Sequence, residues 1–405
     1  MDTLYSEQMT ERRQDIAALV LFLSRETVDP SEYDRARTLC ARVSDWEKVS
    51  EILTRKFVIS VAYSNLLKIQ PDNLPREVLD QMKADATLAS MASLKMVAAQ
   101  DKFYRNCLAP LNCRHAFIKG TGLAQRYYHE PGMRMCRDID VLVSEESIES
   151  VVRLALSNGY KVKIKSDLLT SDPSERALKA LLSYAQIVTL LSPDSTWFEV
   201  HTHIDYGLEM FETERLLASS VALTDQKVGP CVPATAEHFC FVCYHSTRHT
   251  WSRLHWLSDI NAMLDHSSFQ LDEVMSYAKE VGLEPTLNAT LEFQRAARSG
   301  DWAGNMQGLG PYGKQLLEDC VANLADDFET EMNLRSKFNY LGLPYAWMLD
   351  TSARPRAYLN RSRARVRPSY YLYESIPLPR GLQWLYYPMK PIFVFWNRIV
   401  LRRNT

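Results

Sequence analysis

Residues 116–143 read AFIKGTGLAQRYYHEPGMRMCRDIDVLV, and this stretch decides the fold. Its pattern predicts a short strand, a glycine turn at residues 119–122, a short helix at 123–128 and a second strand at 138–143. Glycine adopts positive φ at little cost and lets the backbone approach a ligand closely. We therefore expect a helix whose first backbone N–H groups can hold an anion, followed by a strand that carries acidic side chains.

The second predicted strand, DIDVLV, carries two carboxylates two residues apart, Asp138 and Asp140. Side chains alternate between the two faces of a strand, so both aspartates point one way while Ile139 and Val141 point into the core. Two carboxylates held close together repel each other unless a cation lies between them. Oxygen ligands on a rigid strand suit Mg²⁺, which commonly takes one or two carboxylates and completes its coordination with substrate phosphate.

A third acidic position lies within residues 196–205, TWFEVHTHID. The same two-residue period puts Glu199, His201 and His203 on one face of this predicted strand. If the strand pairs with the one that carries Asp138 and Asp140, Glu199 completes a cluster of three carboxylates. His201 then acts either as a general base or as the group that orients Glu199, and the sequence leaves both roles open.

The order of these motifs resembles the nucleotidyltransferase superfamily, and more closely the bacterial group called nucleotidyltransferase family 5. Members of that group carry Leu-Lys-Gly, a tyrosine, an arginine ahead of Asp-Ile-Asp, a Glu-x-His pair, and a helix with histidine and tryptophan. The corresponding residues here are Ile118-Lys119-Gly120, Tyr127 or Tyr128, Arg134, Asp138-Ile139-Asp140, Glu199-Val200-His201, and the segment from His245 to Asp259. The resemblance covers residues 44–262 and implies an α/β fold, with a small mixed sheet of nucleotidyltransferase type between N-terminal and C-terminal helical regions.

The resemblance also implies a reaction. A nucleoside monophosphate would pass from an NTP, such as ATP, to a hydroxyl group of a small-molecule, sugar or peptide acceptor, with release of pyrophosphate. Members of the group are associated with natural-product and polysaccharide pathways. Asp138, Asp140 and Glu199 would hold two Mg²⁺ or Mn²⁺ ions, with His201 beside them. The residues that contact the nucleotide or the acceptor would be Lys119, Gly120, Thr121, Gly122, Arg134 and His245.

Three other functions fit the same motifs. A protein of this fold could transfer another phosphate-linked group, such as a phospho-alcohol or a sugar phosphate. A degenerate member could bind a nucleotide or a peptide without turnover, although the three carboxylates together argue against that. An interaction protein could use the C-terminal tail alone.

The 405 residues are 46% hydrophobic and 24% charged, an ordinary globular composition with enough apolar material for a large core. We predict an N-terminal helical region at 1–108, a nucleotidyltransferase core at 109–205, a C-terminal helical domain at 206–345 and a tail at 346–405. No apolar run reaches the ~18 residues of a membrane-spanning helix, and no signal peptide is recognisable. The eight cysteines lie in apolar contexts, which indicates reduced thiols and a cytoplasmic protein.

Helical periodicity predicts continuous helices at residues 45–67 and 79–108, and another at 236–264. In the related group the last of these lies beside the active cleft, so His245 and Asp259 are expected to face the substrate. Two cysteines lie between His238 and His245, which is a spacing that invites a zinc interpretation. We reject zinc because positions i and i+2 of a helix diverge.

Positive charge is concentrated at the C-terminal end. Residues 351–405 hold 11 Lys and Arg residues and one acidic residue, Glu374, so the preceding part of the chain is net acidic. Aromatic residues alternate with bases towards the end of this tail, as suits a peripheral membrane surface or an acidic partner. Nucleic acid is a disfavoured partner, because the core is acidic and has no repeated basic and aromatic surface.

Overall fold

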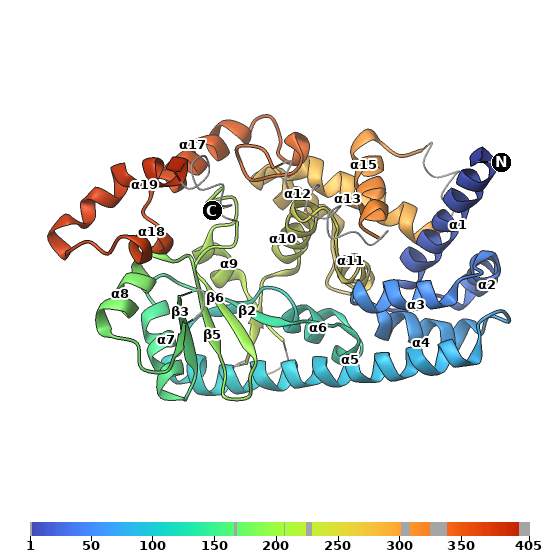
Figure 1. The fold of residues 1–405 in the computed structure, drawn as a ribbon, viewed down its shortest axis with the longest axis horizontal. Helices are drawn as coiled ribbons and strands as arrows, with labels where there is room; N and C mark the ends of the chain where they lie inside the picture. The colour runs from blue at the N-terminus through green and yellow to red at the C-terminus, as the bar shows by residue number, and fades with distance from the viewer. Residues whose placement is uncertain are drawn as a thin grey trace. The chain divides into compact units, whose positions relative to one another are not determined.

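A computed structural model describes residues 2–165, 168–205, 207–223, 229–300, 308–324 and 338–396 (Figure 1). The chain forms two compact units that are interleaved along the sequence. The first, here called the helical unit, comprises residues 1–98, 119–137 and 234–351. The second, here called the sheet unit, comprises residues 99–118, 138–233 and 352–405. The four-part division inferred from the sequence stays a prediction.

The sheet unit is built on six strands in the order β1-β2-β6-β5-β3-β4. Their bounds are β1 (His115–Phe117), β2 (Asp138–Val143), β3 (Lys161–Lys165), β4 (Leu168–Thr170), β5 (Ile187–Leu191) and β6 (Trp197–His201). Strands β2 and β6 run parallel, whereas the other neighbours in this sheet pair antiparallel. The sheet is therefore small and mixed, as predicted, and the α/β fold class is confirmed. Strands β7 (Val221–Ala222) and β8 (Cys231–Val232) form a second, two-stranded sheet.

Alternating apolar side chains fix the faces of the two parallel strands. Ile139 and Val141 of β2 and Phe198 and Val200 of β6 are fully buried. Phe103, the last residue of α5 (Arg76–Phe103), stacks on Phe198 with ring centroids 4.6 Å apart. The opposite face of β2 and β6 is therefore the one that carries the acidic residues.

Further helices of the sheet unit are α7 (Ile148–Ser157), α8 (Glu175–Tyr184), α9 (Thr213–Ser219), α17 (Arg354–Val366), α18 (Tyr370–Ser375) and α19 (Tyr386–Phe395). Ser174 caps α8 by accepting a hydrogen bond from the Ala177 N–H. Leu372, Tyr373 and Tyr386 from the C-terminal segment pack with Ala180 of α8 in one buried cluster. The described part of the tail thus contributes to the core of this unit.

The helical unit contains most of α5 and ten other described helices. These are α1 (Asp2–Leu23), α2 (Tyr33–Arg42), α3 (Trp46–Arg55), α4 (Ile59–Ile69), α6 (Thr121–Tyr127), α10 (Thr235–Arg248), α11 (His255–Asp265), α12 (Leu271–Val281), α13 (Glu284–Ser299) and α15 (Pro311–Leu324). Asp45 caps α3 through its side chain, which accepts from the Lys48 N–H. A long α5 confirms the helix expected at 79–108, although residues 104–108 form a π-helical turn.

The prediction of one helix at 45–67 is wrong. The chain breaks between α3 and α4, where Phe57 has φ +65°. A distant backbone group holds this corner, because Leu254 N–H donates to the Lys56 carbonyl at 3.2 Å. The guanidinium groups of Arg137 and Arg253 also lie over the Phe57 ring, 4.4 and 5.4 Å from its centroid. Tertiary contacts thus override a periodic pattern that continues through the corner.

The helix predicted at 236–264 is likewise interrupted. Thr250 and Trp251 both have positive φ and separate α10 from α11. Trp251 is 1% exposed and packs edge-on against Phe293 of α13, with ring centroids 4.9 Å apart. Its burial explains why a non-glycine residue keeps this strained backbone conformation.

Two further findings concern the whole chain. Among the described residues, the structure contains no helix that is both long and apolar enough to span a membrane. All eight cysteines are thiols rather than disulfides. Burial raises the pKa of Cys40 and Cys107 to about 12, so these thiols are neutral core residues.

Candidate active site

The parallel pairing of β2 and β6 brings the acidic residues together. Asp140 lies directly opposite Glu199, and Asp138 lies opposite Trp197. Asp138 and Asp140 share one face of β2 because they are two residues apart, and Glu199 and His201 share the matching face of β6. The sequence-based expectation that these two strands are neighbours is confirmed.

Three of the side chains converge closely. His201 Nε2 lies 2.9 Å from Asp140 Oδ1 and 3.5 Å from Glu199 Oε2. One ligand atom from each of these residues lies within 4.8 Å of the other two. Asp138 is on the same strand face but does not belong to this convergent group. The arrangement gives a cation two carboxylates and an imidazole as ligands.

Burial grades the three groups. Asp140 is 2% exposed and His201 is 5% exposed, whereas the Glu199 side chain is 33% exposed. With a proton on Nε2, His201 donates a hydrogen bond to Asp140 Oδ1. Glu199 is therefore the most exposed of the three possible ligands, while the buried Asp140 is held in place by His201.

The predicted glycine turn lies in the helical unit. Gly120 has φ +53° and ψ −113°, a conformation that an L side chain rarely adopts, and it precedes α6. The Gly122 N–H donates to the Lys119 carbonyl at 3.0 Å, and the Ala124 N–H donates to the Gly120 carbonyl at 3.0 Å. The expectation of a free Gly122 amide for an anion is therefore wrong in this conformation, because that donor closes the turn.

Arg134 binds a carboxylate rather than standing open for phosphate. Its Nε and Nη2 donate to the two oxygens of Asp259 at 3.1 and 2.8 Å, and the Tyr128 hydroxyl donates to the same carboxylate at 2.8 Å. Arg134 is 5% exposed and Asp259 is fully buried. Burial alone would lower the pKa of Arg134, but the charge of Asp259 and its hydrogen bonds raise it. The predicted orientation of Asp259 towards a substrate is wrong, since both of its oxygens are engaged within the protein.

Comparison with known protein families identifies the family of this chain. A family model described as "Uncharacterised nucleotidyltransferase" matches residues 42–296, which is more than half of the chain and includes every predicted site residue. The chain belongs to this nucleotidyltransferase family. A search among curated proteins returns no match. The protein is therefore a transferase enzyme, and nucleotidyl transfer is its general activity.

His245 of this nucleotidyltransferase lies in a cluster of rings in the helical unit. Its ring centroid is 4.6 Å from that of His249 and 5.5 Å from that of Trp256. Burial lowers the pKa of His245 well below its ordinary value, and the positive charge of Lys119 lowers it further. The imidazole is consequently neutral at physiological pH, when it can accept a hydrogen bond.

The sequence did not predict two ring contacts of His245 in this nucleotidyltransferase. His249 follows His245 by four residues, and that helical spacing could have identified the pair from sequence alone. Trp256 joins them only because the chain turns at Trp251, for which no sequence signal exists. The pairing of Arg134 with Asp259 across 125 residues likewise needed coordinates.

Proposed function

We propose that this nucleotidyltransferase transfers a nucleoside monophosphate from an NTP to a hydroxyl group of its acceptor, with release of pyrophosphate and dependence on a divalent metal ion. The observation that carries the proposal is the placement of Asp140 opposite Glu199, with His201 Nε2 2.9 Å from the first carboxylate and 3.5 Å from the second. Converging carboxylates are suitable ligands for a divalent cation, and phosphoryl transfer uses such cations to offset phosphate charge.

The donor set fits Mg²⁺ or Mn²⁺. Asp140 and Glu199 supply carboxylate oxygens within 4.8 Å of each other, and Asp138 lies on the same strand face. Hard oxygen ligands suit both ions, and the imidazole of His201 is tolerated better by Mn²⁺. When bound, such an ion lowers the pKa of an acceptor hydroxyl and neutralises phosphate charge. The contribution of the chain is to hold the ligands rigidly on adjacent strands.

His201 is proposed as the residue that positions Asp140. Its Nε2 contact with Asp140 is short and buried, so the ring restrains the carboxylate through one hydrogen bond. The alternative role as a general base would require a proton to leave the acceptor for this imidazole. A positioning role predicts partial rescue by glutamine, whose amide can still donate to Asp140, whereas a base role predicts none.

The remaining predicted residues belong to the helical unit, and their roles are proposals. Lys119 would offset charge on the phosphates, and the backbone amides of Gly120 and Thr121 would donate to phosphate oxygens. His245 would accept a hydrogen bond from the nucleotide or the acceptor. Arg134 is proposed to brace this region through Asp259, instead of contacting phosphate directly.

ATP as the donor, a small molecule, sugar or peptide as the acceptor, and a place in natural-product or polysaccharide synthesis are part of the same proposal. The eight free thiols are consistent with a protein that functions in a reducing compartment such as the cytoplasm. A second candidate keeps the site and changes the group: transfer of a phospho-alcohol or a sugar phosphate would use the same carboxylates.

The test separates these reactions by isotope position. The full chain is incubated with each NTP labelled at the α or the γ phosphate, in the presence of Mg²⁺ or Mn²⁺, and products are resolved by chromatography. With α-labelled NTP, we expect the label in the acceptor product. With γ-labelled NTP, we expect the label only in the released pyrophosphate. Asp140→Asn and Glu199→Gln should each lower the rate by at least ~10²-fold.

Glu146→Gln is the matched control, because Glu146 is an exposed carboxylate of the sheet unit outside the convergent group. It should keep the rate of the unmodified protein. Transfer of the γ label would contradict the proposal and indicate a kinase. Unchanged turnover in Asp140→Asn would show that the chemistry does not use this site.

A further inference from the structure

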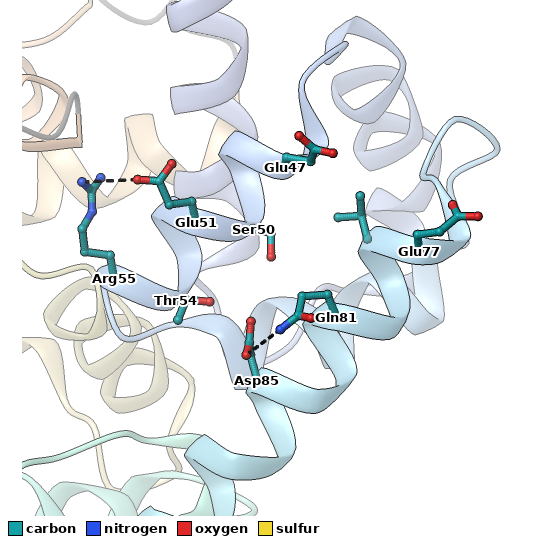
Figure 2. A pocket seen from close by; sticks show the side chains of 9 residues that line it. Glu47, Ser50, Glu51, Thr54, Arg55, Glu77, Gln81 and Asp85 are labelled. Atoms are coloured by element: carbon teal, nitrogen blue, oxygen red, sulfur yellow. Dashed lines mark hydrogen bonds and ion pairs between the residues drawn. The ribbon is translucent and has the colours of Figure 1, made fainter.

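A cavity lies wholly within the helical unit, between α3 and α5 (Figure 2). Its volume is about 530 Å³, within the range of roughly 300–1,000 Å³ that is typical of small-molecule sites. None of its lining residues belongs to the predicted active site. Five come from α3 and four from α5: Glu47, Ser50, Glu51, Thr54 and Arg55, then Glu77, Val78, Gln81 and Asp85.

The lining is strongly acidic. It carries four carboxylates and a single guanidinium, that of Arg55. Arg55 Nη1 lies 3.9 Å from Glu51, whose other oxygen is 2.9 Å from Lys48 Nζ. Glu47, Glu77 and Asp85 form no ion pair with any residue in the described ranges. The lining therefore carries four carboxylates against one guanidinium, and among the described residues no cation pairs with Glu47, Glu77 or Asp85.

Two hydroxyl groups on α3 add an independent feature. Ser50 is only 8% exposed, and its side chain points into the cavity (Figure 2). Within the part of the chain that the structure describes, its hydroxyl has no hydrogen-bond partner. Thr54 Oγ1 is also buried and unpartnered there. A serine or threonine inside a helix can bond back to the carbonyl four residues earlier, and neither Ser50 nor Thr54 does so here. The Ser50 hydroxyl is therefore available to a ligand in the cavity.

A buried polar group without a partner is costly, and native proteins rarely keep one. A ligand N–H donor in the cavity would satisfy the Ser50 hydroxyl, because its oxygen can accept a hydrogen bond. Gln81 also faces this space, and its amide donates to Asp85 at 3.0 Å (Figure 2). The cavity thus offers acceptors along α3 and carboxylates on both helices.

The carboxylates are too dispersed for a single metal ion. Among the described residues, the one group of three convergent metal ligands is Asp140, Glu199 and His201, in the sheet unit. Negative charges spread around a cavity match an extended cation with several separate donors. We propose that this cavity binds a small organic polycation that carries primary ammonium groups, of the polyamine type.

The test uses spermidine as the probe and the full chain as the protein. Binding is measured by isothermal titration calorimetry and by equilibrium dialysis, at fixed ionic strength. We expect saturable binding at one site. The double variant with Glu47→Gln and Asp85→Asn should weaken the affinity about tenfold or more, because each removed charge weakens attraction to an ammonium group. Ser50→Ala should weaken it about three- to tenfold by deleting one acceptor.

Glu273→Gln is the matched control. Glu273 is an exposed carboxylate in the first turn of α12, away from the cavity lining, so its removal changes net charge without touching the cavity. It should bind spermidine as the unmodified protein does. Thermal unfolding of each variant checks its fold, and the double variant alone tests the proposal if Ser50→Ala does not fold.

Three results would overturn the proposal. The first is an absence of saturable spermidine binding. The second is equal weakening by Glu273→Gln, which would mean attraction by net charge alone. The third is displacement of spermidine by Mg²⁺ at constant ionic strength, which would indicate a generic cation atmosphere. Because the probe and the readout involve no NTP, these results do not depend on the proposed transfer reaction.

Discussion

Asp140 has two neighbours of opposite character across the β2–β6 pair. Glu199 repels it, and His201 attracts it through a hydrogen bond of 2.9 Å. When no cation is bound, the hydrogen bond from the imidazole offsets part of the repulsion between the carboxylates. This explains why a nearly buried aspartate can remain beside another acid on an adjacent strand.

The buried Asp259 gives a sharp prediction about stability. Asp259→Asn should lower the free energy of unfolding by about 3–5 kcal/mol, because the Arg134 guanidinium then stays buried without a counter-charge. Tyr128→Phe should cost only about 1–2 kcal/mol, since it deletes one hydrogen bond to that carboxylate. Urea unfolding monitored by circular dichroism measures both.

Asp272→Asn serves as the control, because Asp272 is exposed in the first turn of α12 and should change stability by less than about 0.5 kcal/mol. A double variant with Arg134→Met and Asp259→Leu should recover much of the loss by removing both charges. Full stability in Asp259→Asn alone would contradict the structural role assigned to this pair.

Neutral histidines in the helical unit make stability depend on pH. Burial lowers the pKa of His255 well below its ordinary value, and nearby positive charges lower it further; they belong to Arg134, Arg253, Arg137 and Lys119. His255 therefore binds a proton near pH 6.5 in the unfolded chain, whereas in the folded chain it stays neutral at that pH. Stability is full above that pH and falls as the pH drops, by up to about 1.4 kcal/mol per pH unit for each such histidine.

We expect His255→Gln to flatten this decline, because glutamine does not titrate. Urea unfolding at several pH values between 7.5 and 5 would measure the slope. An equal slope in the His255 variant and the unmodified protein would show that His255 protonates without a penalty in the folded state.

At the level of elements, local patterns predicted the strands better than the helices. The alternation predicted for DIDVLV is observed, and in the strand predicted at 196–205 it holds for Trp197–His201, which form β6. His203 lies beyond the end of β6, so its predicted place on the strand face of Glu199 and His201 is wrong. No local signal predicted the register that puts Asp140 opposite Glu199, since register depends on the whole sheet. The break at Phe57 also escaped, because a hydrogen bond from Leu254, almost 200 residues later, holds it.

The C-terminal element carries a further prediction. Apolar side chains are exposed on and just before α19, and they include Trp384, Tyr387, Ile392, Phe395 and Trp396. We expect the protein to co-sediment with vesicles that contain anionic lipid, because these side chains can insert beside the basic residues of the tail. Replacing Phe395 and Trp396 by serine should weaken binding about tenfold or more.

Leu88→Ser is the control for this experiment, since Leu88 is 67% exposed on α5. Deletion of the tail would be a poor test, because Leu372 and Tyr373 belong to the core of the sheet unit. Equal vesicle binding by the Phe395 and Trp396 variant would contradict a membrane role and favour a soluble acidic partner. Arg398, Arg402 and Arg403 lie outside the described residues.

At the level of the whole molecule, the resemblance predicted the family and the α/β class, and both are confirmed. Of the three carboxylates predicted to cluster, Asp140 and Glu199 meet, whereas Asp138 lies outside the convergent group. The prediction that Arg134 binds phosphate shows that a sequence motif does not identify the partner of a charged side chain. An arginine ahead of Asp-Ile-Asp fits either a ligand contact or an internal ion pair, and only the position of Asp259 distinguishes them.

The interleaving of the two units has a practical consequence for the design of truncated variants. The polypeptide passes from one unit to the other five times, and α5 itself crosses from the helical unit into the sheet unit near residue 98. Neither unit can be produced as one uninterrupted fragment. A stop codon anywhere between residues 138 and 233 leaves the sheet unit without α17–α19 and the helical unit without α10–α15, so truncation should damage both halves at once.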